Sequence, residues 1–162
     1  MTYQIVDNFL DKDIFNEVKT IVESDYFSWY WNEQVTFKAS NVSPYYFTHR
    51  LYEDNAIQSS FYQKIVTPIC KKLEVKAIIR IKVNQYTNVN QFIENENHID
   101  YPFEHKGAIL YLNTNDGYTI LEDGTKIESI ENRLLQFEPH KTHRSTHCMD
   151  TKRRLNINLN YF

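Results

Sequence analysis

Two histidines and an aspartate are the residues of this sequence best suited to bind a metal ion. His98 and Asp100 are separated by one residue, and on a β-strand such residues project from the same face. His143 begins another predicted strand, which a closed β architecture would bring beside that pair. Two imidazoles and one carboxylate are the ligand set of non-haem Fe(II) oxygenases, which keep coordination positions open for substrate and oxygen. We therefore expect a metal site at His98, Asp100 and His143.

The C-terminal segment adds a candidate anion site. Apolar and polar residues alternate strictly from Arg154 onward, so that the arginine shares one strand face with three asparagines. A buried arginine needs an anionic partner, because an unpaired buried charge is costly. A dicarboxylate cosubstrate would supply that partner. The neighbouring Arg153 is the alternative, but on a strand it would face the opposite side.

A period of two predicts short strands from Lys76 to the end of the chain. The expected strands are residues 77–84, 91–100, 107–113, 118–121, 126–130, 133–137, 143–149 and 154–161. Turn residues at 115–117, at 123–124 and at Asn132 are the polar breaks expected between antiparallel strands. About eight short strands after two helices predict a mainly β fold, closed or double-sheeted, with the helices on one outer face.

Two apolar stripes at helical spacing predict those helices in the first half of the chain. The first stripe, from Ile14 to Val22, follows Asp11 as the N-cap. The second runs from Phe61 to Leu73 and contains Pro68, which is expected to kink or split its helix because proline lacks an amide donor. Residues 26–52 between the stripes are rich in aromatics without a clear period. We read them as packed loop, with a lid over the site as the alternative, and expect residues 29–47 at the entrance.

Composition limits the class of protein. The 162 residues are 41% hydrophobic and 24% charged, which is typical of one globular domain. The sequence has no apolar run long enough to span a bilayer and no export signal, and two cysteines agree with a reducing cytoplasm. A net charge of −3 argues against a nucleic-acid clamp, although residues 139–154 are locally basic.

Residues 76–162 resemble the catalytic core of the Fe(II)/2-oxoglutarate-dependent dioxygenases, in particular the prolyl-4-hydroxylase-like group with its short phage and bacterial members. The resemblance rests on the histidine, aspartate and arginine spacing, on the run Tyr111-Leu112-Asn113, on the strand at 132–137 and on the opening at 6–10. It implies one domain over residues 1–162. Residues 76–162 would form a double-stranded β-helix (jelly-roll, cupin-like) core, and residues 1–75 a helical support with the aromatic loop.

The same resemblance implies a role for each candidate residue. His98, Asp100 and His143 would be the catalytic iron ligands. The residues that would bind 2-oxoglutarate are Arg154 at its far carboxylate, Tyr111 and Tyr86 as hydrogen-bond donors, and Asn156, where some relatives carry serine.

His140 and His147 flank the favoured distal ligand in the sequence. His143 is preferred because it has the family spacing to both Phe137 and Arg154. His147 is interpreted as a residue that supports a ligand or as an exposed one. His105 and His49 are interpreted as structural or surface residues, and His105 as near enough to reach the pocket entrance.

By resemblance, the activity is that of a 2-oxoglutarate-dependent hydroxylase. The implied cofactors are Fe(II), 2-oxoglutarate and O2, with ascorbate as an optional addition. The enzyme would hydroxylate a C–H bond of a peptidyl side chain such as proline, or of a small molecule, while 2-oxoglutarate decarboxylates to succinate and CO2. Nucleic acid and membrane are not expected partners, and the oligomeric state is left open. The alternatives are a non-catalytic cupin-like metal-binding or sensor domain, which would not need Arg154, and a phosphate-binding module at residues 139–154.

Overall fold

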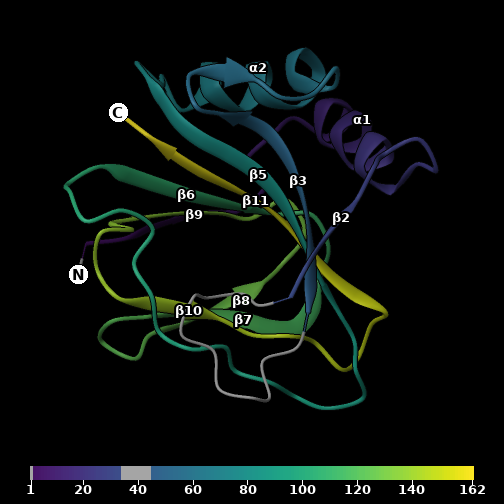
Figure 1. The fold of residues 1–162 in the computed structure, drawn as a ribbon, viewed down its shortest axis with the longest axis vertical. Coiled ribbons are helices and arrows are strands. Elements are labelled where there is room, and N and C mark those ends of the chain that lie inside the picture. Colours follow the sequence, from purple (N-terminus) through teal and green to yellow (C-terminus); the bar gives the residue numbers. More distant parts are fainter. Residues whose placement is uncertain (1, 34–44) are drawn as a thin grey trace.

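The chain folds into two antiparallel β-sheets that face each other, with two helices on the outside (Figure 1). The computed structural model describes residues 2–33 and 45–162. The larger sheet has the strand order β1-β9-β6-β11-β5-β3-β2, with β4 paired to β3, and the smaller sheet has the order β10-β7-β8. The strands are β1 (Gln4–Val6), β2 (Tyr30–Asn32), β3 (Tyr46–Glu53), β4 (Ala56–Ile57), β5 (Ile78–Thr87), β6 (Lys106–Tyr111), β7 (Asn115–Leu121), β8 (Lys126–Ser129), β9 (Leu134–Phe137), β10 (His143–Ser145) and β11 (Arg153–Tyr161).

Strands from distant parts of the sequence are interleaved in the larger sheet. The last strand, β11, lies between β5 and β6 and pairs with β5 along its whole length. β1, near the N-terminus, pairs with β9 and forms the edge of the sheet opposite to β2. This is the double-stranded β-helix that the family resemblance implies, and it agrees with the double-sheeted β fold that the strand pattern predicts. Within the described residues, neither helix is long and apolar enough to cross a membrane.

Both helices lie on the face of the larger sheet that points away from the smaller sheet (Figure 1). α1 (Lys12–Glu23) starts after Asp11, as predicted, and Ser24 is its C-cap. α2 (Tyr62–Lys72) continues through Pro68, so of the two predicted outcomes, a kink or a split, the split is wrong. The carbonyl that loses its partner belongs to Lys64, an exposed residue, where water can replace the missing amide.

Two apolar cores lie on the two faces of the larger sheet. The larger core joins the helices to the outer face, and β11 contributes Leu155, Ile157, Leu159 and Tyr161 to it. The smaller core lies between the sheets and contains residues of β6, β7, β8 and β9. The polar face of β11 therefore points into the space between the sheets, as its alternation predicts.

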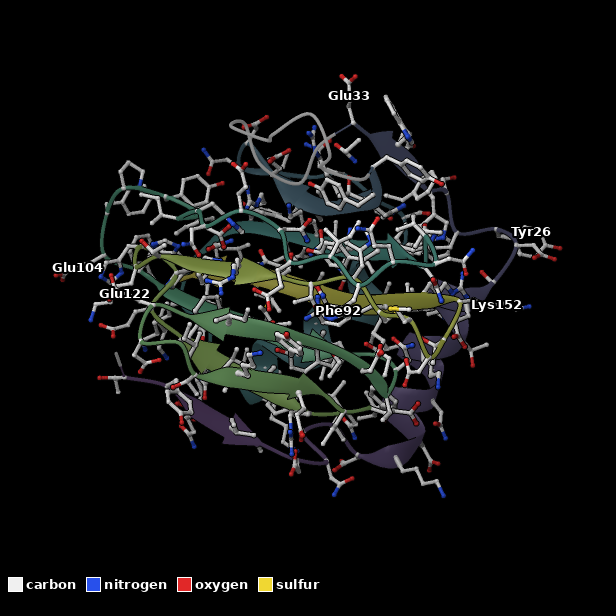
Figure 2. All side chains as sticks on the ribbon, turned by 90° about the horizontal axis from the view of Figure 1, so that it is seen from below. Tyr26, Glu33, Phe92, Glu104, Glu122 and Lys152 are labelled. Carbon is white, nitrogen blue, oxygen red and sulfur yellow. The ribbon has the colours of Figure 1, made fainter. Side chains whose placement is uncertain are left out.

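Residues 91–100 do not form the predicted continuous strand. They run alongside β10 and the residue after it, but pair only through two isolated bridges, His98 with His143 and Glu94 with Thr146. Between these bridges the Asn95 side chain bonds to Ser145 Oγ, and side-chain amides of this kind compete with a regular ladder. Phe92, seen near the centre of Figure 2, packs on Tyr118 of β7 with ring centroids 5.4 Å apart. The segment therefore extends the smaller sheet without becoming part of it.

Three other sequence predictions need correction. The turn expected at 115–117 is a bulge inside β7, because the register with β8 shifts between Asn115 and Tyr118. The strand expected at 143–149 ends at Ser145. The aromatic stretch read as loop contains β2 and most of β3. Their sequences do not alternate between apolar and polar residues, because aromatic side chains lie on both faces of these strands. Residues 34–44 of that stretch lie outside the described part of the chain.

Asn132 ties the N-terminal segment to the turn before β9. Its side-chain amide donates to the Leu10 carbonyl at 2.8 Å, and its Oδ1 accepts from the Leu10 amide at 2.9 Å. We expect Asn132→Ala to lower the free energy of unfolding by roughly 2–4 kcal/mol, because both buried backbone groups of Leu10 lose their partner. Asn90→Ala is the matched control, since Asn90 has the same φ of 58° but lies on the surface. Equal losses in urea unfolding of the two variants would contradict the prediction.

Candidate active site

His98, Asp100 and His143 meet between the two sheets. His143 is the first residue of β10, and His98 lies opposite it in an antiparallel bridge. The amide of each histidine donates to the carbonyl of the other at 2.9 Å, and their ring centroids lie 4.5 Å apart. One nitrogen from each histidine and one oxygen of Asp100 all lie within 4.8 Å of one another. These three atoms are close enough to bind one metal ion.

A backbone carbonyl faces one ring nitrogen of each histidine. Nδ1 of His143 lies 3.0 Å from the Lys141 carbonyl oxygen, and Nδ1 of His98 lies 3.4 Å from that of Glu96. A proton on Nδ1 leaves the lone pair on Nε2, and metal-binding histidines are commonly oriented in this way. His98 Nε2 lies 3.9 Å from Asp100 Oδ1. The Nε2 lone pairs are therefore available to a metal ion beside the carboxylate.

The charge states of these donors suit a cation. Burial, together with the nearby His143, lowers the pKa of His98 to about 4. Burial raises the pKa of Asp100, but nearby positive charges, among them Arg80 and Lys82, outweigh burial and hold the pKa at about 2. At neutral pH His98 is uncharged and Asp100 is ionised. Arg80 Nη2 lies 3.2 Å from Asp100 Oδ1 and helps to hold the carboxylate in place.

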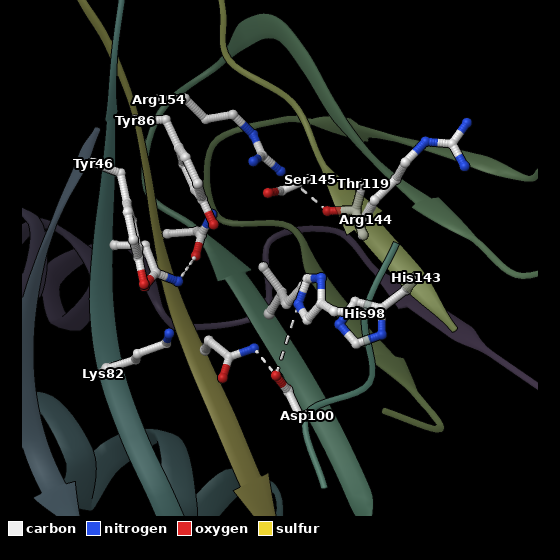
Figure 3. Close-up of a pocket in the computed structure, with 14 residues that line it drawn as sticks. Tyr46, Lys82, Tyr86, His98, Asp100, Thr119, His143, Arg144, Ser145 and Arg154 are labelled. Carbon is white, nitrogen blue, oxygen red and sulfur yellow. Dashed lines mark hydrogen bonds and ion pairs between the residues drawn. The ribbon is translucent and has the colours of Figure 1, made fainter. Parts of the chain in front are cut away.

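Arg154 lines the same pocket, and none of its surface is exposed to solvent (Figure 3). Its guanidinium donates to Ser129 Oγ at 2.7 Å, to Thr119 Oγ1 at 3.0 Å and to the Thr146 carbonyl oxygen at 3.2 Å. These acceptors are neutral. Among residues 2–33 and 45–162, no carboxylate forms an ion pair with Arg154. A buried positive charge without a counter-charge favours binding of an anion.

The four residues predicted to bind the cosubstrate are neighbours. The guanidinium carbon of Arg154 lies 5.3 Å from the ring centroid of Tyr86 and 5.5 Å from that of Tyr111. Tyr86 and Asn156 line the pocket. Tyr111 is fully buried, and its hydroxyl donates to Thr119 Oγ1 at 2.8 Å. Tyr111 itself does not line the pocket, whereas Thr119, the acceptor of its hydroxyl, does.

Gly117 leaves room for the arginine side chain. A Cβ atom at this position would lie 2.7 Å from Arg154 Cδ and 3.0 Å from the His147 carbonyl oxygen. The first distance is shorter than Cβ atoms show in real structures and the second is shorter than most Cβ contacts, so a larger residue at 117 would displace the arginine side chain. The bulge in β7 thus shapes the anion site.

The pocket opens between the sheets and has about 440 Å³ of empty volume, including its entrance (Figure 3). Its wall is mostly polar, and the larger sheet supplies most of it. The lining residues are Tyr46, Lys82, Asn84, Tyr86, His98, Asp100, Ile109, Thr119, His143, Arg144, Ser145, Arg154, Asn156 and Asn158. The three candidate metal ligands and Arg154 are therefore open to one shared space.

The other two C-terminal histidines do not belong to the group of three donors. His147 is fully buried, which excludes a surface position, and its Nδ1 lies 2.9 Å from the Thr87 carbonyl oxygen. Its ring packs edge-on against Tyr86, with centroids 5.5 Å apart. The ring centroid of His140 lies 6.4 Å from that of His105.

His49 and His105 are buried residues, so the surface alternative is wrong for both. His49 lies between the Ser28 carbonyl oxygen at 2.6 Å and Ser59 Oγ at 2.7 Å. His105 Nε2 donates to Asn160 Oδ1 at 2.8 Å. Both histidines hold neighbouring segments together and do not line the pocket.

Arg153 points away from the pocket, as the period of two predicts. Its Nη1 donates to Gln85 Oε1 at 3.1 Å, and its Nη2 lies 3.7 Å from Glu23 Oε1 of α1. The two adjacent arginines therefore lie on opposite faces of β11.

Sequence reasoning did not single out several residues of the pocket wall on β3 and β5, although Tyr46 lies within the stretch 29–47 that was expected at the entrance. Tyr46 stacks on Tyr86 with ring centroids 5.6 Å apart and an interplanar angle of 14°. Lys82 and Asn84 follow on the same face of β5. The available signal was a polar residue at every second position from Arg80 to Tyr86, which matches the polar face of β11.

Comparison with known proteins supports the fold. No protein-family model matches the sequence, and no curated protein matches it significantly. A prolyl hydroxylase from Trichoplax adhaerens, solved with a peptide of the hypoxia inducible factor oxygen degradation domain, superimposes with a TM-score of 0.72 at 17% identity, covering 99% of this chain and 83% of that one. An oxidoreductase of the 2OG-Fe(II) oxygenase family from Burkholderia pseudomallei gives 0.73 at 9% identity, with 98% and 84% covered. A Pseudomonas putida prolyl-4-hydroxylase gives 0.61 at 15% identity, with 98% and 91% covered. The chain has the fold of these oxygenases.

Proposed function

We propose that this protein is an Fe(II)- and 2-oxoglutarate-dependent dioxygenase that hydroxylates a C–H bond of its substrate. The observation that carries the proposal is the shared pocket, in which a two-histidine, one-carboxylate group lies beside a buried arginine without a counter-charge. Metal binding alone would not require that arginine. A cosubstrate that chelates the metal at one end and carries a carboxylate at the other would use both features.

The donor set fits iron. Two neutral imidazole nitrogens and one carboxylate oxygen are the combination used by non-haem Fe(II) oxygenases, and three ligands leave positions free for other molecules. His98, Asp100 and His143 would hold the ion. When bound, iron would supply oxygen activation for hydroxylation, coupled to the conversion of 2-oxoglutarate to succinate and CO2.

The remaining pocket residues would bind and orient the cosubstrate. Arg154 would donate to its far carboxylate as a charge-assisted pair, and the stacked Tyr46 and Tyr86 rings would form one wall. Because Arg154 is already held by Ser129 and Thr119, little ordering would be needed on binding. Burial of this end of the pocket would also exclude water from the carboxylate.

For the substrate, we propose a side chain of a peptide or a small molecule. Two of the three similar structures described above are prolyl hydroxylases, and the Trichoplax enzyme was solved with a peptide. A peptidyl proline is therefore the first substrate to test. Fold similarity does not identify a substrate, so the choice depends on the chemistry of the pocket wall.

The proposed function is tested by adding Fe(II) and 2-oxoglutarate to the protein without oxygen. We expect a visible metal-to-ligand charge-transfer absorption that saturates at one iron per chain, because 2-oxoglutarate chelates an iron ion with free coordination positions. Zn(II) in place of Fe(II) is the control, since it has no such transition. Iron binding without any 2-oxoglutarate-dependent absorption would contradict the oxygenase and leave the metal-binding domain as the function.

A further inference from the structure

Lys82 is a positive charge in the pocket to which the proposed reaction assigns no ligand, although with Arg80 it helps to lower the pKa of Asp100. It lies on the inner face of β5 and lines the pocket together with His98 and Asp100. Figure 3 shows its side chain pointing into the space between Tyr46 and Asp100. The ammonium lies 5.7 Å from the centre of the Tyr46 ring, and it makes no hydrogen bond or ion pair with any residue in the described part of the chain.

The carboxylates near Lys82 are already paired with other cations. Asp100 accepts from Arg80 at 3.2 Å, and Glu53 pairs with Arg50 at 2.9 Å. Each of these pairs is internally neutral. The nearby charges therefore leave Lys82 as an unbalanced cation.

The other cations that line the pocket have partners or a use. Arg144, at the entrance, pairs with Glu94 at 3.1 Å. Arg154 is assigned to the far carboxylate of the cosubstrate. A bound divalent metal would add two positive charges and 2-oxoglutarate two negative ones, so loading the site would not neutralise Lys82.

Keeping such a lysine is costly. Burial is the main reason that the pKa of Lys82 falls to about 8, with the charge of Arg80 adding to the effect. A group that only filled space on the Tyr46 ring would be more stable without a charge, as methionine is. The charge is therefore better explained by a ligand that neutralises it.

We infer that the primary substrate carries a carboxylate that binds to Lys82 while the C–H bond to be hydroxylated lies near the metal site. This inference rests on the proposed function and narrows its substrate class to acidic peptides, C-terminal residues or small organic acids. A substrate carboxylate at Lys82 would orient the remainder of the molecule relative to His98 and Asp100, which line the same pocket.

The test uses acetate as the carboxylate probe and acetamide as its neutral analogue. The protein is labelled with lysine carrying 13C at Cε and loaded with Zn(II) and 2-oxoglutarate, so that the metal site and Arg154 are occupied. The Lys82 signal is identified as the one missing in Lys82→Met. We expect acetate to shift it saturably and acetamide to leave it unchanged. The exposed lysines serve as internal controls, and their signals should change only linearly or not at all.

Three results would overturn the inference. The first is a Lys82 signal without a saturable shift in acetate. The second is an equal shift with acetamide. The third is a loss of 2-oxoglutarate affinity of about tenfold or more in Lys82→Met, because Lys82 would then bind the cosubstrate; we expect that affinity to stay within about threefold of wild type. If the protein takes up neither metal nor 2-oxoglutarate, the proposed function fails, and the acetate titration of the unloaded protein still tests Lys82.

Discussion

Replacing His143 with alanine is expected to abolish stable iron binding. The variant loses one of three donor atoms that lie within 4.8 Å of one another. The free energy of zinc binding at four-ligand sites is about 10–16 kcal/mol, which is on the order of 3 kcal/mol for each ligand. The loss of one ligand should therefore weaken iron binding by roughly 100-fold. Iron content after desalting and anaerobic titration with Fe(II) measure this directly.

His147→Ala and His140→Ala are the matched controls for this prediction. Both should keep one iron per chain, because neither side chain belongs to the group of three donors. His147→Ala should lower the free energy of unfolding, since the side chain is fully buried and bonded to the Thr87 carbonyl. Normal iron content in folded His143→Ala, or loss of iron in folded His147→Ala, would refute the ligand assignment.

Arg154→Ala is expected to impair cosubstrate binding while leaving iron binding nearly unchanged. The truncation would leave the far carboxylate of 2-oxoglutarate unpaired in a desolvated place, which costs about 2–5 kcal/mol, or roughly 30-fold to several-thousandfold in affinity. Arg154→Lys should be intermediate, because the ammonium keeps the charge but cannot make two parallel hydrogen bonds. Anaerobic titration of the iron-loaded variants with 2-oxoglutarate, followed by the visible absorption, gives the affinities.

Arg153→Ala is the control that removes a positive charge from β11 without changing the pocket. Its guanidinium lies on the opposite face of β11, where it bonds to Gln85 and approaches Glu23. Its 2-oxoglutarate affinity should therefore stay near wild type. If the two arginine variants lose the same affinity, or if Arg154→Ala loses none, the anion site is not at Arg154.

The sequence alone determined the features that local periodicity encodes. A period of two distinguishes Arg154 from Arg153, because alternate residues of any strand face opposite sides. Apolar residues that recur every 3.6 positions predicted α1 to within one residue of its observed bounds. The types and spacing of His98, Asp100 and His143 predicted a metal site, since few residue types bind iron and each brings a recognisable side chain.

Only the tertiary structure decided which segments meet. The pairing of His98 with His143 depends on two reciprocal backbone hydrogen bonds between residues far apart in the chain, and no local pattern contains that register. The bulge at Gly117 and the strand β3 were misread because turn residues can also lie in a bulge, and because strands buried on both faces lose their alternation. Lys82 became visible as an unpaired charge only once Asp100 and Glu53 were seen to be paired with other cations, because charge balance in a pocket is a property of distances in space.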